Sequence, residues 1–82
     1  MTIKIGKRPK LTTFLKKLGW QSDGWCQDSQ VFKHMKYPDS RILIDDDEYH
    51  WSMVTWPDLN GQVGGKGKAS FVAQLKAEGQ LP

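Results

Sequence analysis

The sequence predicts one small α+β domain with two layers: a three-stranded antiparallel sheet and two helices packed on one face of it. Three observations predict this class. Apolar residues recur at helical spacing near both ends, the central segment alternates as strands do, and turn residues divide that segment. Eighty-two residues can enclose one hydrophobic core and not two. We therefore expect a single domain over 1–82 with the element order α-β-β-β-α.

The first helix is expected to follow an N-terminal segment, 1–8, that forms an edge strand or an arm. One helical face carries apolar residues at i, i+3, i+4 and i+7, namely Leu11, Phe14, Leu15 and Leu18. Gly19 suits the left-handed residue that ends a helix, which lets Trp20 fold back on Leu15. The pattern therefore predicts both the helix and its closure.

Strand chemistry replaces the helical period between Trp20 and Trp56. The stretches "QVFKHMKY", "RILID" and "HWSMVTW" are rich in branched and aromatic residues, and "PDS" and "DDEY" between them are turn signals. A first strand is expected around "GWCQDS", which leads into the strand in "QVFKHMKY" or is continuous with it. We expect a three-stranded meander, then a long glycine-rich loop over 57–68, then a second helix in "KASFVAQLKAEGQL" that stops at Gly79.

Composition indicates the cellular location and excludes some kinds of site. Cys26 is the only cysteine, so no intramolecular disulfide can form, which fits a reducing, cytoplasmic location, and we expect a half-buried thiol. No apolar run approaches the ~20 residues that a membrane helix needs, and the N-terminus lacks the apolar core of a signal peptide. We expect no membrane association, cofactor, metal ion or catalytic residue.

Charge is strongly segregated along the chain, although the formal net charge is only +3. Residues 1–20 carry six cations and no acid, whereas residues 45–58 carry five acids and no base. Such a bipolar chain can dock a polyanion with one end, or its two ends can lie next to each other in the fold.

The stretch "GQVGGKGK", residues 61–68, has four glycines and two lysines just before the second helix. It is not a P-loop, because Gln62 occupies the position of the first glycine and Ala69 replaces the hydroxyl residue. Nucleotide hydrolysis is therefore not predicted. Glycine backbone, a helix N-terminus and two lysines together still suit an anion. A flexible connector that carries solubilising lysines is the alternative.

These patterns favour a non-enzymatic module that binds the phosphates of duplex RNA or DNA. The residues expected to contact phosphate are Lys7, Arg8, Lys10, Lys16, Lys17, Lys66 and Lys68. Binding of this kind is weakly sequence-specific and falls steeply with salt. The prediction requires that the N-terminal cations and the lysines flanking Gly67 share one side of the molecule, away from the aspartates.

The alternative is a small protein-binding regulator or inhibitor, of the kind that phages encode. It would dock through exposed tryptophans and through the acidic turn, which we define as Asp45–Glu48. The residues expected in this interface are Asp45, Asp46, Asp47, Glu48, Trp51 and Trp56. A metal or acid–base role for the acidic turn with His50 is disfavoured, because alternate residues of an extended chain point apart.

Two family resemblances accompany these patterns. The α-β-β-β-α order with "GGKGKASFVAQL" opening the last helix resembles double-stranded RNA-binding domains, which implies backbone phosphate contacts at that helix start. The same layout with "LKKLGW" and "DSQVFKHMKYPDSRILI" resembles small ribonuclease toxins of the HicA type. In that second comparison the position of the active histidine reads Ser29 or Gln30, so RNA cleavage is not predicted.

Overall fold

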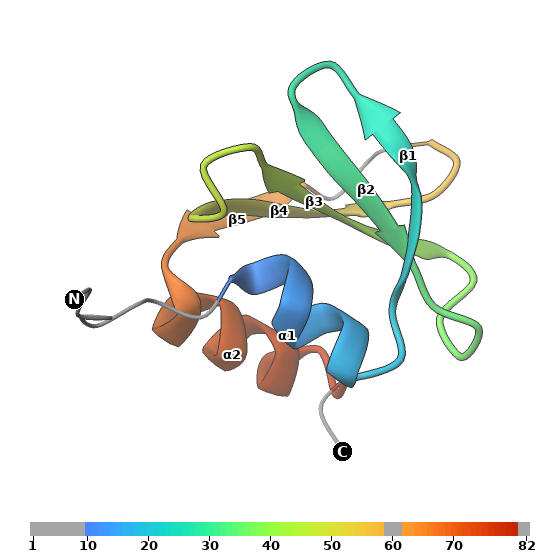
Figure 1. Ribbon diagram of the computed structural model, residues 1–82. Helices are drawn as coiled ribbons and strands as arrows, with labels where there is room; N and C mark the ends of the chain where they lie inside the picture. The colour runs from blue at the N-terminus through green and yellow to red at the C-terminus, as the bar shows by residue number, and fades with distance from the viewer. Residues whose placement is uncertain (1–9, 59–61, 81–82) are drawn as a thin grey trace, which may run out of the picture.

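The computed structural model describes residues 10–58 and 62–80 as two helices and a five-stranded sheet (Figure 1). The elements in chain order are α1 (Leu11–Lys17), β1 (Gln21–Cys26), β2 (Ser29–Lys33), β3 (Ser40–Asp45), β4 (His50–Thr55), β5 (Val63–Lys66) and α2 (Lys68–Ala77). Every neighbouring pair of strands is antiparallel, and the strands lie in the sheet in sequence order. The sheet is therefore a simple meander.

The α+β class and the antiparallel sheet are confirmed, and Figure 1 shows both helices on the same side of the sheet. The predicted number of strands is wrong, because the sheet has five strands and not three. The α-β-β-β-α layout behind both family resemblances therefore does not hold. The predicted arm or edge strand over 1–8 lies outside the described residues.

The strand expected around "GWCQDS" is β1, which is separate from β2 and forms a hairpin with it. Cys26 pairs with Ser29, and Gln27 between them takes a positive φ of 57° that closes a two-residue turn. All residues of β1 are exposed, because β1 is an edge strand in a hairpin that rises away from the helices (Figure 1). The Cys26 thiol is accordingly exposed, which corrects the expectation of a half-buried thiol.

The strand that the prediction missed is β5, inside the segment predicted to be a loop. Val63 pairs with Met53 and Gly65 pairs with Trp51, so β5 forms the second edge of the sheet. A run of glycines usually weakens a strand. Here a glycine is required, because a Cβ on Gly65 would lie 2.8 Å from Cζ2 of the Trp51 indole. The glycines that suggested a loop therefore allow β5 to pack against Trp51.

The core lies between the helices and the sheet. The register places Phe32 beside Ile42, Ile42 beside Met53, and Ile44 beside Trp51 on the helix-facing side. From the helices, the buried apolar side chains are Leu11, Leu15, Phe71 and Leu75. Full burial of one such side chain contributes about 1.5–3 kcal/mol, so this cluster is the main stabilising feature of the fold.

Both helices end in the same left-handed closure. Gly19 and Gly79 have φ of 97° and 70°. The N–H of Trp20 donates to the Leu15 carbonyl at 3.0 Å, and the residue after Gly79 makes the equivalent bond to the carbonyl of Leu75 at 2.9 Å. The predicted closure at Gly19 is thus confirmed. Within 10–58 and 62–80, no helix is long and apolar enough to cross a membrane.

The sheet also has a face turned away from the helices, which we call the open face. Because side chains alternate along a strand, the residues next to the core positions belong to it. The open face carries Val31, Lys33, Arg41, Leu43, Asp45, His50, Ser52 and Lys66.

Candidate functional site

The cations predicted to bind phosphate are distributed over both layers. Lys7 and Arg8 lie outside the described residues. Lys10 is the residue before α1, Lys16 and Lys17 lie in its last turn, Lys66 ends β5, and Lys68 begins α2. All five of these described lysines are exposed. Their side chains are therefore open to solvent and to partners.

One of these lysines contacts an aromatic ring that joins the two helices. The Lys68 ammonium lies 4.6 Å from the centroid of the Phe14 ring, which joins the start of α2 to the middle of α1. Lys17 stands three residues after Phe14 on α1, a spacing that places the two side chains on the same helical face. Lys10 is the residue before α1 and has an extended backbone. We call Lys10, Lys17 and Lys68 the lysine cluster. Among the described residues, no carboxylate forms an ion pair with any of its members.

Lys66 and Lys16 lie apart from the lysine cluster. Lys66 is directly opposite His50 on the open face, whereas Lys68 contacts the helical layer. The two lysines flanking Gly67 therefore face different sides of the domain, unlike the predicted arrangement. Lys16 is two residues after Phe14, which turns it about 160° around α1 from that residue.

The acidic turn lies against the start of α1. Glu48 accepts hydrogen bonds from the backbone N–H of Thr12 at 3.1 Å and from its hydroxyl at 3.0 Å. The next carbonyl, that of Tyr49, accepts from the N–H of Gly67 at 2.8 Å, just before α2. The acidic turn is therefore joined to the N-terminal ends of both helices. Glu48 acts as a structural helix cap.

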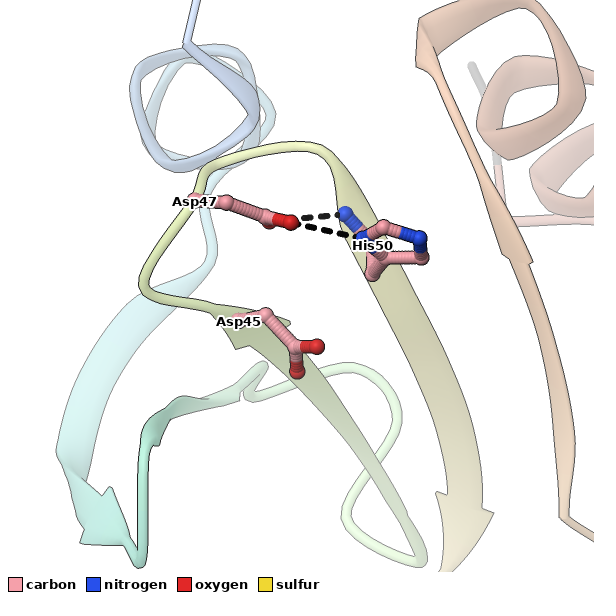
Figure 2. A group of neighbouring side chains, drawn as sticks. All are labelled: Asp45, Asp47 and His50. Atoms are coloured by element: carbon pink, nitrogen blue, oxygen red, sulfur yellow. Dashed lines mark hydrogen bonds and ion pairs between the residues drawn. The ribbon is translucent and has the colours of Figure 1, made fainter.

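Asp47 and His50 close the same turn (Figure 2). One oxygen of Asp47 accepts the backbone N–H groups of Tyr49 and His50 at 2.8 and 3.1 Å, and the other lies 2.6 Å from His50 Nδ1. An ionised carboxylate only accepts, so Nδ1 carries the proton. These bonds, led by the backbone N–H of His50, lower the pKa of Asp47 from 3.8 to about 2.

Asp45 lies beside this pair on β3, where it accepts a 2.7 Å hydrogen bond from the Ser29 hydroxyl. One ligand atom from each of Asp45, Asp47 and His50 lies within 4.8 Å of the others, a spacing compatible with a metal ion. Both oxygens of Asp47 already accept hydrogen bonds from within the turn. The arrangement is explained by turn closure.

The glycines that suggested an anion site are explained by packing around Trp51. The Trp51 indole N–H donates to the Ser70 hydroxyl at 3.1 Å, and this hydroxyl donates to the Lys66 carbonyl at 2.5 Å. Gly65 lies on the same indole, and Gly67 has a φ of 85° with its Cα turned to the Tyr49 ring. These residues join β5 to α2 around a buried tryptophan.

The tryptophans do not form the predicted docking patch with the acidic turn. Trp51 is only 4 % exposed, so its indole is not available at the surface. Trp56 is 40 % exposed but follows the far end of β4, which begins beside the acidic turn. Trp25, on β1, is 62 % exposed. Trp56 therefore lies away from the acids with which it was grouped.

Sequence reasoning missed a charged site at the end of the open face opposite to the acidic turn. Arg41 lies across the sheet from Val54, its guanidinium stacks on Trp56 at 4.7 Å, and Asp23 on β1 pairs with both Arg41 and Lys33. The residues that meet here come from three strands. Only the register of the hairpins brings them together, and the sequence pattern carries no signal for that register.

No family model matches the sequence, and neither the curated proteins nor the solved structures contain a match to this chain. Function is therefore inferred from the arrangement of this chain's own residues.

Proposed function

We propose that the protein is a non-enzymatic module that binds duplex RNA or DNA by contacting phosphates with the lysine cluster. The observation that carries the proposal is the contact of Lys68 with Phe14, which joins the start of α2 to the helix that Lys10 precedes and Lys17 ends. All three lysines are exposed and without carboxylate partners among the described residues. Three exposed ammonium groups in the helical layer form a footprint for a polyanion.

The charge of the helical layer supports the same function. Residues 10–18 and 68–78 together contain five lysines and a single acid, Glu78. Glu48 borders this layer, but its carboxylate is engaged by Thr12. The remaining aspartates lie on the strands and turns of the sheet. A phosphate backbone that approaches the helices therefore meets a positive surface, and one that approaches the acidic turn is repelled.

Lysine contacts of this type position a nucleic acid without reading its bases. An ammonium on a flexible stem binds phosphate as a point charge, so affinity depends on counterion release and little on sequence. We expect similar affinity for duplexes of unrelated sequence, and a strong loss of affinity as salt is raised.

The test compares two triple variants with the same change of charge. The first variant lacks the lysine cluster and carries Lys10→Gln, Lys17→Gln and Lys68→Gln. The second variant lacks three other lysines and carries Lys16→Gln, Lys66→Gln and Lys76→Gln. Duplex binding is measured by fluorescence anisotropy over a salt series. The slope of log K against log salt is expected to fall by about 0.9 for each phosphate that is no longer neutralised, and only in the first variant.

Equal weakening by both triple variants would show that net charge alone drives binding, and would reject the lysine cluster as the site. Absence of duplex binding by the unaltered protein at low salt would reject the function itself. Circular dichroism and thermal unfolding of both variants establish that each is folded before affinities are compared.

A protein-binding regulator is the second candidate, favoured by the exposure of Trp25 and Trp56. Tryptophan side chains at a surface are typical anchors of protein interfaces. Trp25→Ser and Trp56→Ser would abolish capture of a specific partner and leave duplex binding intact if this candidate is right. Loss of duplex binding in the same variants would count against it.

A further inference from the structure

A hollow of about 420 Å³ opens at the end of the open face that is farther from the acidic turn. Its lining residues are Gln21, Lys33, His34, Met35, Pro38 and Arg41. We call it the Arg41 hollow. Its volume is in the range of small-molecule sites, roughly 300–1,000 Å³. It lies on the opposite side of the sheet from the lysine cluster, so it does not depend on the function proposed above.

Arg41 is the most enclosed charged group in the wall. Its side chain is 13 % exposed, and Nη1 donates to the carbonyls of Pro38 and Ser40 at 3.0 and 2.9 Å. The Nε donor is fully buried and has no hydrogen-bond partner in the described part of the chain. Buried donors are nearly always satisfied, so an orphaned guanidinium N–H calls for an acceptor.

The carboxylate of Asp23 stands where such an acceptor would bind. One of its oxygens lies 3.4 Å from Arg41 Nε and the other lies 3.6 Å from Lys33 Nζ. Charge-assisted hydrogen bonds between these groups are usually about 2.7–2.9 Å long. Asp23 therefore neutralises the two cations loosely. It sits in the β1 bulge next to Gly24, where the chain can withdraw the side chain.

We propose that the Arg41 hollow binds a small phosphate monoester, whose phosphate replaces the Asp23 carboxylate between Lys33 and Arg41. A carboxylate ligand would gain little, because Asp23 already supplies a carboxylate. A phosphate carries nearly twice the charge and has three acceptor oxygens, enough to reach Arg41 Nε and the Lys33 ammonium together. The exchange is therefore favourable for phosphate in particular.

The rest of the wall fits an organic body attached to that phosphate. Met35 is 86 % exposed at the rim, and a thioether adapts to flat or irregular ligands. Pro38 adds a rigid apolar surface. His34 offers no free donor, because Nδ1 accepts the N–H of Lys36 and Nε2 therefore donates to the Leu18 carbonyl. A nucleoside monophosphate matches this combination of cations and apolar wall.

In the experiment, the intact protein is titrated with AMP, adenosine and inorganic phosphate. Binding is measured by calorimetry and by the fluorescence of Trp56, which stacks on Arg41. AMP is expected to bind more tightly than either fragment. Asp23→Asn is expected to tighten AMP binding severalfold, because it removes the competing carboxylate. Lys33→Gln is expected to weaken it about tenfold, because it removes a charge-assisted hydrogen bond to the phosphate. Lys36→Gln, which removes the same charge outside the wall, is the matched control.

Arg41→Gln removes the other cation that holds the phosphate and is also expected to weaken AMP binding. If the Arg41→Gln variant does not fold, the Lys33→Gln variant still tests the proposal. The proposal is overturned if Asp23→Asn binds AMP no better than the unaltered protein, or if Lys36→Gln weakens binding as much as Lys33→Gln. If adenosine bound as tightly as AMP, the phosphate would not contribute to binding and the proposal would be rejected. Equal binding of inorganic phosphate and AMP would remove the role of the apolar wall.

Discussion

Glu48 caps α1 from 36 residues away, because its carboxylate accepts both the backbone N–H and the hydroxyl of Thr12. The helix has no side-chain cap of its own and no acid in its first turn. The β3–β4 turn therefore supplies the negative group that the start of a helix favours. This contact also fixes the helical layer, and with it the lysine cluster, relative to the sheet.

Removal of this cap is expected to destabilise the fold. Glu48→Ala should lower the free energy of unfolding by about 1 kcal/mol, the usual cost of losing a helix cap. Urea denaturation measures the loss. Asp46→Ala removes an acid from the same turn that is exposed, and should change stability by no more than about 0.5 kcal/mol. Equal effects of the two substitutions would show that Glu48 acts only through general charge.

A second prediction concerns the contact between Gly65 and Trp51. Gly65→Ala should cost about 1–3 kcal/mol, because the new methyl group overlaps the indole at 2.8 Å. Thermal unfolding measures the cost. Trp51→Phe makes room beside residue 65, so the double variant should be less destabilised than the sum of the single ones. Strict additivity would mean that Gly65 serves chain flexibility instead of packing.

Local signals in the sequence predicted the helices well. The 3.6-residue period of α1 and the left-handed residues Gly19 and Gly79 depend only on neighbours along the chain. The strands were harder to predict. β1 has no buried residue to create an alternation, and the glycines of β5 are needed for a contact with Trp51 that only the folded sheet creates. The errors in the predicted strands thus arise from the arrangement of the folded sheet and not from local sequence patterns.

The candidate sites show the same division. The sequence identified the basic residues and the acidic turn, but not that Glu48 would cap α1 or that Lys66 and Lys68 would face different sides. The pairing of Asp23 with Arg41 depends on the registers of β1, β2 and β3. A shift of one residue would turn these side chains to the other face, so no local pattern could have placed them together.

His34 is expected to matter for stability more than His50 does. His34 joins the end of α1 to β2 through the Leu18 carbonyl, and its ring packs on Trp20 with centroids 5.1 Å apart. His34→Ala should therefore cost about 1–2 kcal/mol, because it removes a hydrogen bond and an aromatic pair. His50→Ala changes an exposed side chain in a turn and should cost less. Chemical denaturation of the two variants gives the comparison, and a larger loss for His50→Ala would contradict this role for His34.

The hydrogen bonds that Asp47 accepts from His50 and Tyr49 predict a particular response to acid. The pKa of Asp47 is lowered from 3.8 to about 2 in the folded chain, chiefly by the backbone N–H of His50. A carboxyl with a lowered folded pKa contributes stability above its unfolded value and loses that contribution as pH falls through its folded value. The difference in Tm between the unaltered protein and Asp47→Asn should thus be constant above pH 3.8 and shrink as the pH falls toward about 2. Asp46→Asn removes the same charge from an exposed neighbour, and a matching pH dependence in that variant would show that the Asp47 hydrogen bonds are not the cause.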